Sequence, residues 1–232
     1  MNIEEVTDTV LESPRPILLI DTCSILDIAR LARSNGADSL ERELAAIDHI
    51  IDMLNHDTVW MILTDEVKTE LARNKEGVFS ETKRWTQDLQ ENLKKLCRLH
   101  GNIQNVVVTD EQLNNVSVGL ESRISNVIEN ALTIAEDQDC FVRGSKRNNN
   151  RIPPGSMGKE HGDCIIYEHY LACAHLLRQR GFERKIIYLT SNTSDYCHAK
   201  TTTLKEEIAV DLKGLQIDFV TKWQWCLNQI AT

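Results

Sequence analysis

The sequence predicts an α/β fold with a mostly parallel sheet that is covered by helices on both faces. Short apolar runs with the length of buried strands alternate with longer segments whose apolar residues recur at helical spacing. Connections of this kind form right-handed crossovers between parallel strands. The chain has 232 residues, of which 41% are hydrophobic and 26% charged, as in an ordinary globular protein. We therefore expect a single domain over residues 1–232.

Each expected element follows from a local pattern. The apolar run 17–20 opens after Pro16 and closes at Asp21, which is typical of a strand buried on both faces. Thr22 or Ser24 can cap a helix directly after it. In the first third of the chain the expected elements are a strand at 17–20, a helix that Asn35-Gly36 ends, a helix at 39–55, a strand at 59–63 and a helix at 64–74.

The rest of the chain contains a long helical part and a basic segment. The expected elements are a helix at 79–100, a strand-like run at 105–109, a helix at 121–137, a helix at 163–180 and strands at 186–189 and 217–220. Residues 76–138 are expected to be mainly helical and to form an insertion or cap on the α/β core. Residues 143–161 show no periodicity and are predicted to be a loop, too long for a simple connection.

Charge is distributed unevenly along the chain. The net charge is −9, which argues against a nucleic-acid partner because neutralised phosphates supply most of such affinity. Between residues 141 and 161, however, five basic side chains stand against a single acidic one, Glu160. The five are Arg143, Lys146, Arg147, Arg151 and Lys159. This local excess predicts a loop that contacts a phosphate backbone, and an ordinary solvated loop is the alternative.

Several classes of protein are excluded. The seven cysteines are an odd number without a C-x-x-C pair, so neither a disulfide framework nor a structural zinc site is expected. No apolar run approaches the roughly 18 residues that cross a bilayer. The N-terminal segment is acidic, unlike a secretory signal peptide, so a cytoplasmic location is expected. The absence of G-x-G-x-x-G argues against a dinucleotide-binding enzyme.

Acidic residues repeatedly follow the predicted strands. Asp21 ends the first strand, and Glu66 and Glu70 lie on the helix after the second. Asp163 begins a helix, and Asp195 follows a later strand. Functional groups gather at the carboxyl ends of parallel strands, and carboxylates held together there stay ionised mainly when Mg²⁺ or Mn²⁺ joins them. Each one alone is explained equally well as a helix cap or a solvated side chain, but together they predict a metal site.

Four motifs carry a resemblance to a known family. The segments ILLIDTCSIL, LTDEVKTEL, KEHGDCII and IYLTSNTSDY resemble the successive motifs of PIN-domain nucleases, and RIPPGSMGKEHGDCIIYE resembles a longer bacterial branch of that superfamily. The resemblance implies a three-layer α/β/α fold and a nuclease that depends on Mg²⁺ or Mn²⁺ and usually acts on RNA. It implies that Asp21, Glu70 and Asp163 are metal-site carboxylates and that Asp195 is the fourth acidic group.

The chain departs from the family pattern at Asn192. Many members have T-x-D-x-D-F after the fourth strand, whereas this chain has Asn192 at the first acidic position and Asp195 one residue later than the second. An asparagine can provide a carbonyl oxygen as a ligand but contributes no charge. Weaker binding of a second metal ion, or a different role for Asp195, therefore stays open. Lys159 is expected to neutralise a scissile phosphate, with a solvated loop lysine as the alternative, and His161 is either a proton carrier or a bystander.

The expected function is hydrolysis of phosphodiester bonds by an endoribonuclease that acts on single-stranded RNA. A metal-activated water attacks phosphorus, so no side-chain nucleophile is required. A phosphatase of the haloacid-dehalogenase type is disfavoured because Asp21-Thr22-Cys23 lacks D-x-D. The alternative is a catalytically inactive PIN-like module that binds RNA or a protein. Single-stranded DNA as substrate, a homodimer and a protein partner encoded alongside all stay open, whereas a membrane partner is not expected.

Overall fold

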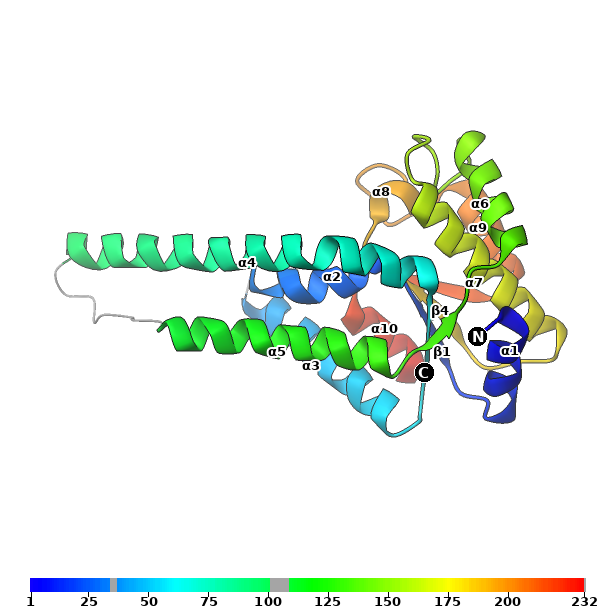
Figure 1. Cartoon of the computed structure of the whole chain (residues 1–232), viewed down its shortest axis with the longest axis horizontal. Helices are drawn as coiled ribbons and strands as arrows, with labels where there is room; N and C mark the ends of the chain where they lie inside the picture. The colour runs from blue at the N-terminus through cyan, green and yellow to red at the C-terminus, as the bar shows by residue number, and fades with distance from the viewer. Residues whose placement is uncertain (34–36, 101–108, 232) are drawn as a thin grey trace.

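The computed structural model describes residues 1–33, 37–100 and 109–231, and its core is a five-stranded sheet (Figure 1). The strands are β1 (Ile17–Ile20), β2 (Trp60–Thr64), β3 (Leu132–Ile134), β4 (Ile186–Leu189) and β5 (Ile217–Val220). Their order across the sheet is β3-β2-β1-β4-β5, and all four neighbouring pairs run parallel. The predicted α/β fold with a parallel sheet is confirmed.

β1 lies at the centre of the sheet because its residues are apolar on both faces. None of the four is more than 1% exposed. Ile17 stands beside Trp60 of β2 and Ile186 of β4. The chain continues from β1 to β2 on one side and reaches β4 on the other, so the strand order reverses between β1 and β4. At such a switch point the carboxyl ends of the strands border a crevice in which functional sites form.

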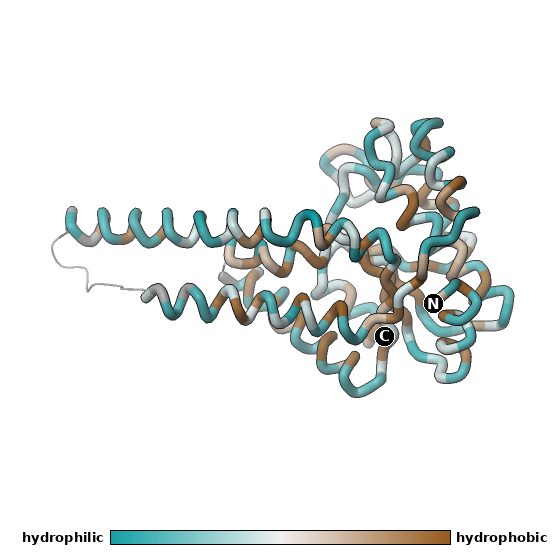
Figure 2. The backbone as a smooth tube through the Cα atoms, viewed as in Figure 1, coloured by the Kyte–Doolittle hydropathy of each residue, from teal (hydrophilic) through white to brown (hydrophobic). Residues whose placement is uncertain are grey.

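Helices surround the sheet in two groups. Their bounds are α1 (Ile3–Glu12), α2 (Thr22–Arg30), α3 (Ala37–Asn55), α4 (Asp65–His100), α5 (Asp110–Glu129), α6 (Gln138–Asn149), α7 (His161–Gln179), α8 (Thr193–Tyr196), α9 (Glu206–Gly214) and α10 (Trp223–Ala231). α7 packs against α1 and α6, whereas α2, α3, α5 and α10 form the second group. Hydrophobic residues gather at the sheet and the helices next to it (Figure 2). No helix among the described residues is long and apolar enough to cross a membrane.

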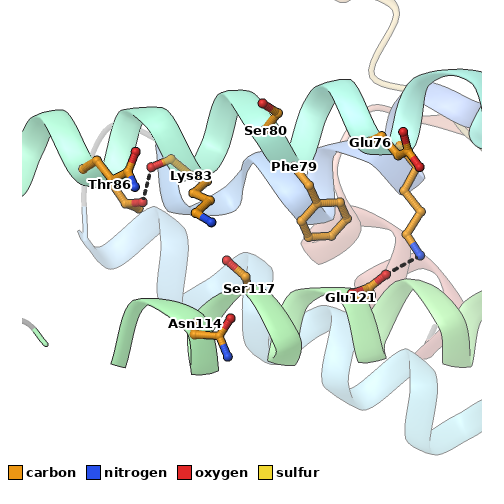
Figure 3. A pocket seen from close by; sticks show the side chains of 10 residues that line it. Glu76, Phe79, Ser80, Lys83, Thr86, Asn114, Ser117 and Glu121 are labelled. Carbon is orange, nitrogen blue, oxygen red and sulfur yellow. Dashed lines mark hydrogen bonds and ion pairs between the residues drawn. The ribbon is translucent and has the colours of Figure 1, made fainter. Parts of the chain in front are cut away.

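α4 and α5 form a helical arm that projects from the sheet (Figure 1). The name helical arm is used here for residues 83–100 of α4 and 110–119 of α5, and a groove of about 850 Å³ lies between the two helices (Figure 3). At their inner ends both helices pack on α2, and Val78 of α4 and Ile124 of α5 are buried there. The arm lies inside the segment 76–138, which also supplies β3, the edge strand of the sheet. That segment is therefore not helical throughout.

Two predicted helices are one element. The helices expected at 64–74 and 79–100 are continuous in α4. Gly77 lies near the expected break, and nothing lies within 4 Å of the position that a Cβ would take there. A glycine inside a helix costs about 1 kcal/mol relative to alanine. The burial of Leu71 and Val78 on either side of Gly77 outweighs this cost.

The prediction of a loop over residues 143–161 is wrong in its first part, because α6 continues to Asn149. The inward face of α6 carries Cys140, Gly144 and Asn148, which are small or polar, so hydrophobic periodicity gives no signal. A Cβ at Gly144 would lie 2.8 Å from the Cα atom of Ile165. Glycine is therefore needed for α6 to pack directly on α7.

The segment 121–137 also differs from its prediction. The helix expected there, α5, begins at Asp110 and ends at Glu129, and β3 follows it. Thr109 caps α5 by accepting a hydrogen bond from the backbone N–H of Gln112 at 3.2 Å. β3 is three residues long, too short for an alternating pattern to be recognised. The run expected at 105–109 up to residue 108 and the predicted stop at Asn35-Gly36 lie outside the described residues.

Candidate active site

Asp21 is held at the carboxyl end of β1 by two hydrogen bonds. Its side chain is fully buried. One carboxylate oxygen accepts from the backbone N–H of Thr22 at 2.7 Å, and the other accepts from the hydroxyl of Thr190 at 2.8 Å. Thr190 directly follows β4, so the second bond joins the ends of the two strands that flank the switch point. Asp21 does cap α2, but it also belongs to this interstrand contact.

Glu70 reaches the same place from the second turn of α4. The hydroxyl of Thr22 donates to its carboxylate at 2.7 Å, so Thr22 is bonded to both Asp21 and Glu70. Asn74 donates to the Glu70 backbone carbonyl and not to its side chain, whereas the charge of Arg73 lowers the pKa of Glu70. The Thr22 hydroxyl therefore holds the Glu70 carboxylate near Asp21.

Gly162 brings Glu70 close to the start of α7. A Cβ at Gly162 would lie 3.2 Å from Cδ of Glu70 and 3.4 Å from a carboxylate oxygen of Glu66, and closer still to a carboxylate oxygen of Glu70. A side chain here would have to displace the Glu70 carboxylate. Asp163 is the next residue, so α7 presents its carboxylate beside the one on α4.

Neighbouring carboxylates act electrostatically on Asp21 and Asp163. Burial, followed by the charges of Asp21, Glu70 and Asp195, raises the pKa of Asp163 to about 8. Burial raises the pKa of Asp21 to about 6, opposed by the Thr190 hydrogen bond and reinforced by Glu70 and Asp195. The pKa of Glu70 is also raised, chiefly by burial. The site is a pocket of negative charge, and such a pocket favours a cation.

Asn192, which directly precedes α8, and Asp195, which lies within α8, border this pocket. The Asn192 amide donates to the Asp195 carboxylate at 2.6 Å, and its carbonyl accepts from the hydroxyl of Ser194 at 2.8 Å. A hydrogen bond from the Asn192 side chain also lowers the pKa of Asp163. Lys205, which the sequence analysis did not identify, donates to the backbone carbonyls of Ser194 at 3.0 Å and Asp195 at 2.7 Å. A lysine ten residues from Asp195 gives no motif by which to find it.

The donor set fits a hard divalent cation, although the ligands are not gathered in a direct coordination shell. Among the described residues, no three His, Cys, Asp or Glu side chains are grouped closely enough to hold a metal ion. Mg²⁺ usually keeps several waters and binds proteins through only one or two carboxylates. The charges that raise the pKa of Asp163 are those of Asp21, Glu70 and Asp195, and a bound cation would offset them. The residues therefore fit an ion that is held partly through water.

Two of the basic residues predicted to contact substrate lie in an ion-pair network. Arg147 donates to Glu168 at 2.7 Å, to Asp211 at 2.9 Å and to the Pro153 carbonyl at 2.6 Å, and its side chain is only 12% exposed. Arg143 donates to the same Glu168 at 3.1 Å. These contacts join α6, α7 and α9. Arg147 thus faces carboxylates and not solvent.

The other two predicted basic residues are exposed. Arg151 follows α6 and adopts a left-handed backbone with φ of 55°. Lys159 lies two residues before α7, and its backbone N–H donates to Glu160 at 3.0 Å. His161 is exposed at the first position of α7, where its ring lies 3.0 Å from the hydroxyl of Ser145 and packs edge-on against Phe141. The structure therefore separates the basic run into an ion-paired network around Glu168, in which only Arg147 is largely buried, and an exposed pair.

Comparison with known families agrees with this arrangement. The family model of the PIN domain matches residues 18–196, a span that begins in β1, ends in α8 and contains every acidic residue of the site. The chain belongs to the PIN-domain family, whose members are generally nucleases. Comparisons with curated proteins and with solved structures give no match.

Proposed function

We propose that this PIN-domain protein is a divalent-metal-dependent endoribonuclease that cleaves single-stranded RNA. The observation that carries the proposal is the electrostatic coupling of Asp21, Glu70 and Asp163 at the crevice between β1 and β4. Burial and neighbouring carboxylates raise the pKa values of Asp21 and Asp163, which is costly to the fold, and proteins accept such a cost at functional sites. A bound cation removes the cost and supplies the chemistry.

Mg²⁺ or Mn²⁺ is the proposed ion. Asp21, Glu70 and Asp163 are its proposed ligands, directly or through water, and Asp195 and Asn192 complete the border of the site. When bound, such an ion lowers the pKa of a water molecule and stabilises negative charge that develops on the phosphate oxygens. Family membership supports a nuclease, and the all-oxygen donor set supports these two ions over a soft metal.

The neighbouring residues of this chain are proposed to orient the acidic groups. Thr190 and the Thr22 backbone fix both oxygens of Asp21, and the Thr22 hydroxyl fixes one oxygen of Glu70. Lys159 and Arg151 are the proposed phosphate contacts, because they are exposed. Arg143 and Arg147, which the sequence analysis placed in the same role, are proposed to position α6 against α7 instead.

Asn192 supports the second candidate function, a module that binds RNA without cleaving it. This position contributes no charge, and its amide is occupied by Asp195 and Ser194. A site with one carboxylate fewer binds a second cation more weakly. Retention of RNA without cleavage would be the signature of this function.

Incubation of the purified protein with labelled single-stranded RNA and single-stranded DNA, in Mn²⁺ or in chelator, tests the proposal. We expect cleavage of RNA in Mn²⁺ and none in chelator. Asp21→Asn should abolish cleavage. Asp57→Asn is the matched control, because Asp57 is an exposed aspartate at φ of 56°, a conformation that asparagine tolerates. RNA binding without cleavage by the parent protein would favour the inactive module.

A further inference from the structure

Lys205 completes the hydrogen bonding of α8, the one-turn helix that carries Asp195. A helix leaves its last four backbone carbonyls without partners inside it, and α8 has only four residues. The Lys205 ammonium donates to the carbonyl of Ser194 at 3.0 Å and to that of Asp195 at 2.7 Å. Its backbone N–H donates to the carbonyl of Tyr196 at 3.0 Å. Three successive carbonyls of α8 therefore accept from one residue.

A short backbone excursion brings Lys205 back to α8. An antiparallel bridge between Cys197 and Leu204 closes this excursion, and the backbone N–H of His198 donates to the Thr203 carbonyl at 2.9 Å. α9 begins at the residue after Lys205, so the lysine is anchored on both sides along the chain. Isolated helices shorter than about 12 residues are marginal in water. The single turn of α8 therefore depends on contacts from outside itself, and Lys205 supplies three of them.

The third hydrogen bond of the Lys205 ammonium reaches the opposite wall of the site. It goes to the hydroxyl of Ser156 at 3.1 Å, in the connection between α6 and α7. That connection also carries the exposed Arg151 and Lys159. Gly155 fixes it in place, because a Cβ there would lie 2.7 Å from an atom of α6 and 2.7 Å from an atom of α7. Lys205 thus joins α8 to the segment that is proposed to contact phosphate.

The place of the Asp195 carboxylate depends on this turn. It accepts from the Asn192 amide at 2.6 Å, a bond between the residue before α8 and a residue within it. The charge of Asp195 raises the pKa values of Asp21 and Asp163, so its carboxylate acts on both. A loosened α8 would release Asp195 from this arrangement.

We propose that Lys205 is a positioning residue of the nuclease site, and that it keeps the Asp195 carboxylate at the place where the divalent cation binds. The inference rests on the proposed function. Lys205 does not itself contact the substrate, because an ammonium has three hydrogens and all three point to neutral oxygens of this chain. The acidic wall and the basic segment therefore share one anchor.

The affinity of the metal-free protein for Mn²⁺, measured by electron paramagnetic resonance of the free ion, tests the proposal. Lys205→Met removes the three donors and should weaken Mn²⁺ binding at least roughly tenfold, because the site loses an ordered carboxylate. The sign of the change is informative. A lysine that acts only as a nearby positive charge repels the cation, so its removal would tighten binding. A lysine that only supports the fold would leave the affinity unchanged and lower the melting temperature.

Lys213→Met is the matched control. Lys213 is an exposed lysine in the last turn of α9, so the variant removes the same charge from the same helix and should keep the Mn²⁺ affinity of the parent. Ser156→Ala removes only the bond to the α6–α7 connection and should also keep it. A loss in Ser156→Ala as large as in Lys205→Met would contradict a role of Lys205 through α8.

A double-variant cycle tests whether Lys205 acts through Asp195. Asp195→Ala should weaken Mn²⁺ binding, and Lys205→Met added to it should weaken binding no further. Additive losses would contradict the proposal. Circular dichroism establishes that each variant is folded. If Lys205→Met does not fold, Lys205→Arg replaces it: the planar guanidinium keeps the charge but not the arrangement of the donors, and should weaken Mn²⁺ binding by a smaller factor. The parent's affinity in folded Lys205→Arg would then overturn the proposal.

Cleavage of single-stranded RNA by the same proteins separates this inference from the proposed function. A parent protein that binds Mn²⁺ and cleaves RNA, with equal or tighter Mn²⁺ binding in Lys205→Met, would overturn the role of Lys205 and leave the nuclease standing. A parent that binds no Mn²⁺ would overturn the proposed function and this inference with it. In a parent that binds Mn²⁺ without cleaving RNA, the change in affinity still decides the role of Lys205.

Discussion

The hydroxyl of Thr190 donates a hydrogen bond to Asp21 at 2.8 Å and so joins the ends of β4 and β1. The same hydroxyl accepts from the backbone N–H of Asn192 at 3.1 Å. One side chain therefore fixes a buried carboxylate and also the start of the loop that carries Asp195. Because the bond favours the ionised form of Asp21, it opposes the rise in pKa that burial causes.

Thr190→Val should damage the site more than the fold. The variant keeps the shape of the side chain but removes the donor, so one oxygen of a buried carboxylate loses its partner at a cost of about 1 to 3 kcal/mol. We expect RNA cleavage to fall at least roughly tenfold and the pKa that limits activity to rise. Thr190→Ser keeps the hydroxyl and should retain most activity. Equal pH–rate profiles for the valine and serine variants would show that the bond is irrelevant to catalysis.

The metal-free protein should lose stability as pH rises. The pKa values of Asp163 and Asp21, about 8 and about 6, exceed the ordinary 3.8, so the folded protein binds protons that the unfolded chain has released. Stability gained by this protonation is present at about pH 4 and is lost on passing to about pH 8. Melting temperatures in chelator should fall over this range, and Asp163→Asn should flatten the decline. A flat profile in the parent protein would contradict the coupling.

Gly162→Ala should reduce RNA cleavage, whereas the control Gly77→Ala in α4 should change only the stability of the protein. The added Cβ would collide with the Glu70 carboxylate and push it away from Asp163. We expect a strong loss of RNA cleavage, which a fluorescent substrate would measure. Gly77→Ala is the control in α4, where a Cβ meets nothing within 4 Å; it should raise the free energy of unfolding by up to about 1 kcal/mol. Full activity in Gly162→Ala would remove Glu70 from the site.

Variants of the ion-paired basic residues should lower stability, whereas variants of the exposed basic residues should weaken RNA binding. Arg147→Ala leaves Asp211 without its ion-pair partner and Glu168 with Arg143 alone, and breaking a buried pair of this kind costs about 3 kcal/mol. Arg151→Glu with Lys159→Glu should leave the melting temperature unchanged but weaken RNA binding and flatten its salt dependence. Binding measured at several salt concentrations decides this. Unchanged affinity in the second variant would make the exposed pair ordinary solvated residues.

The sequence predicted the elements that hydrophobic patterns mark. The runs at 17–20 and 186–189 are fully buried strands with the predicted bounds, because continuous apolar residues have few other solutions in a parallel sheet. The strand at 217–220 also has the predicted bounds, although its Asp218 is exposed. It failed for α6, whose inner face is Cys140, Gly144 and Asn148, and for the three-residue β3. In both elements tertiary packing, and not local pattern, decides the structure.

The sequence predicted the acidic residues of the candidate site, but not the residues that hold them in place through hydrogen bonds. Strand ends predict that Asp21 and Glu70 lie at one edge of the sheet, where the carboxyl ends of parallel strands meet, and motif order adds Asp163 to the proposed site. Thr190 and Lys205 act through hydrogen bonds between segments far apart in the chain, which no local pattern encodes. The distribution of charge also misassigned Arg147, because sequence does not tell whether an arginine faces a phosphate or a buried glutamate.

Anomalous diffraction from crystals grown with Mn²⁺ would locate the bound ion. We predict a peak in the crevice between β1 and β4, with carboxylate oxygens of one or two of Asp21, Glu70 and Asp163 about 2.0 to 2.6 Å from it and the remaining contacts through water. Crystals of Asp21→Asn, grown in the same buffer, should lose or weaken this peak. A peak only at other positions, in protein that cleaves RNA in that buffer, would contradict the assignment of the metal site.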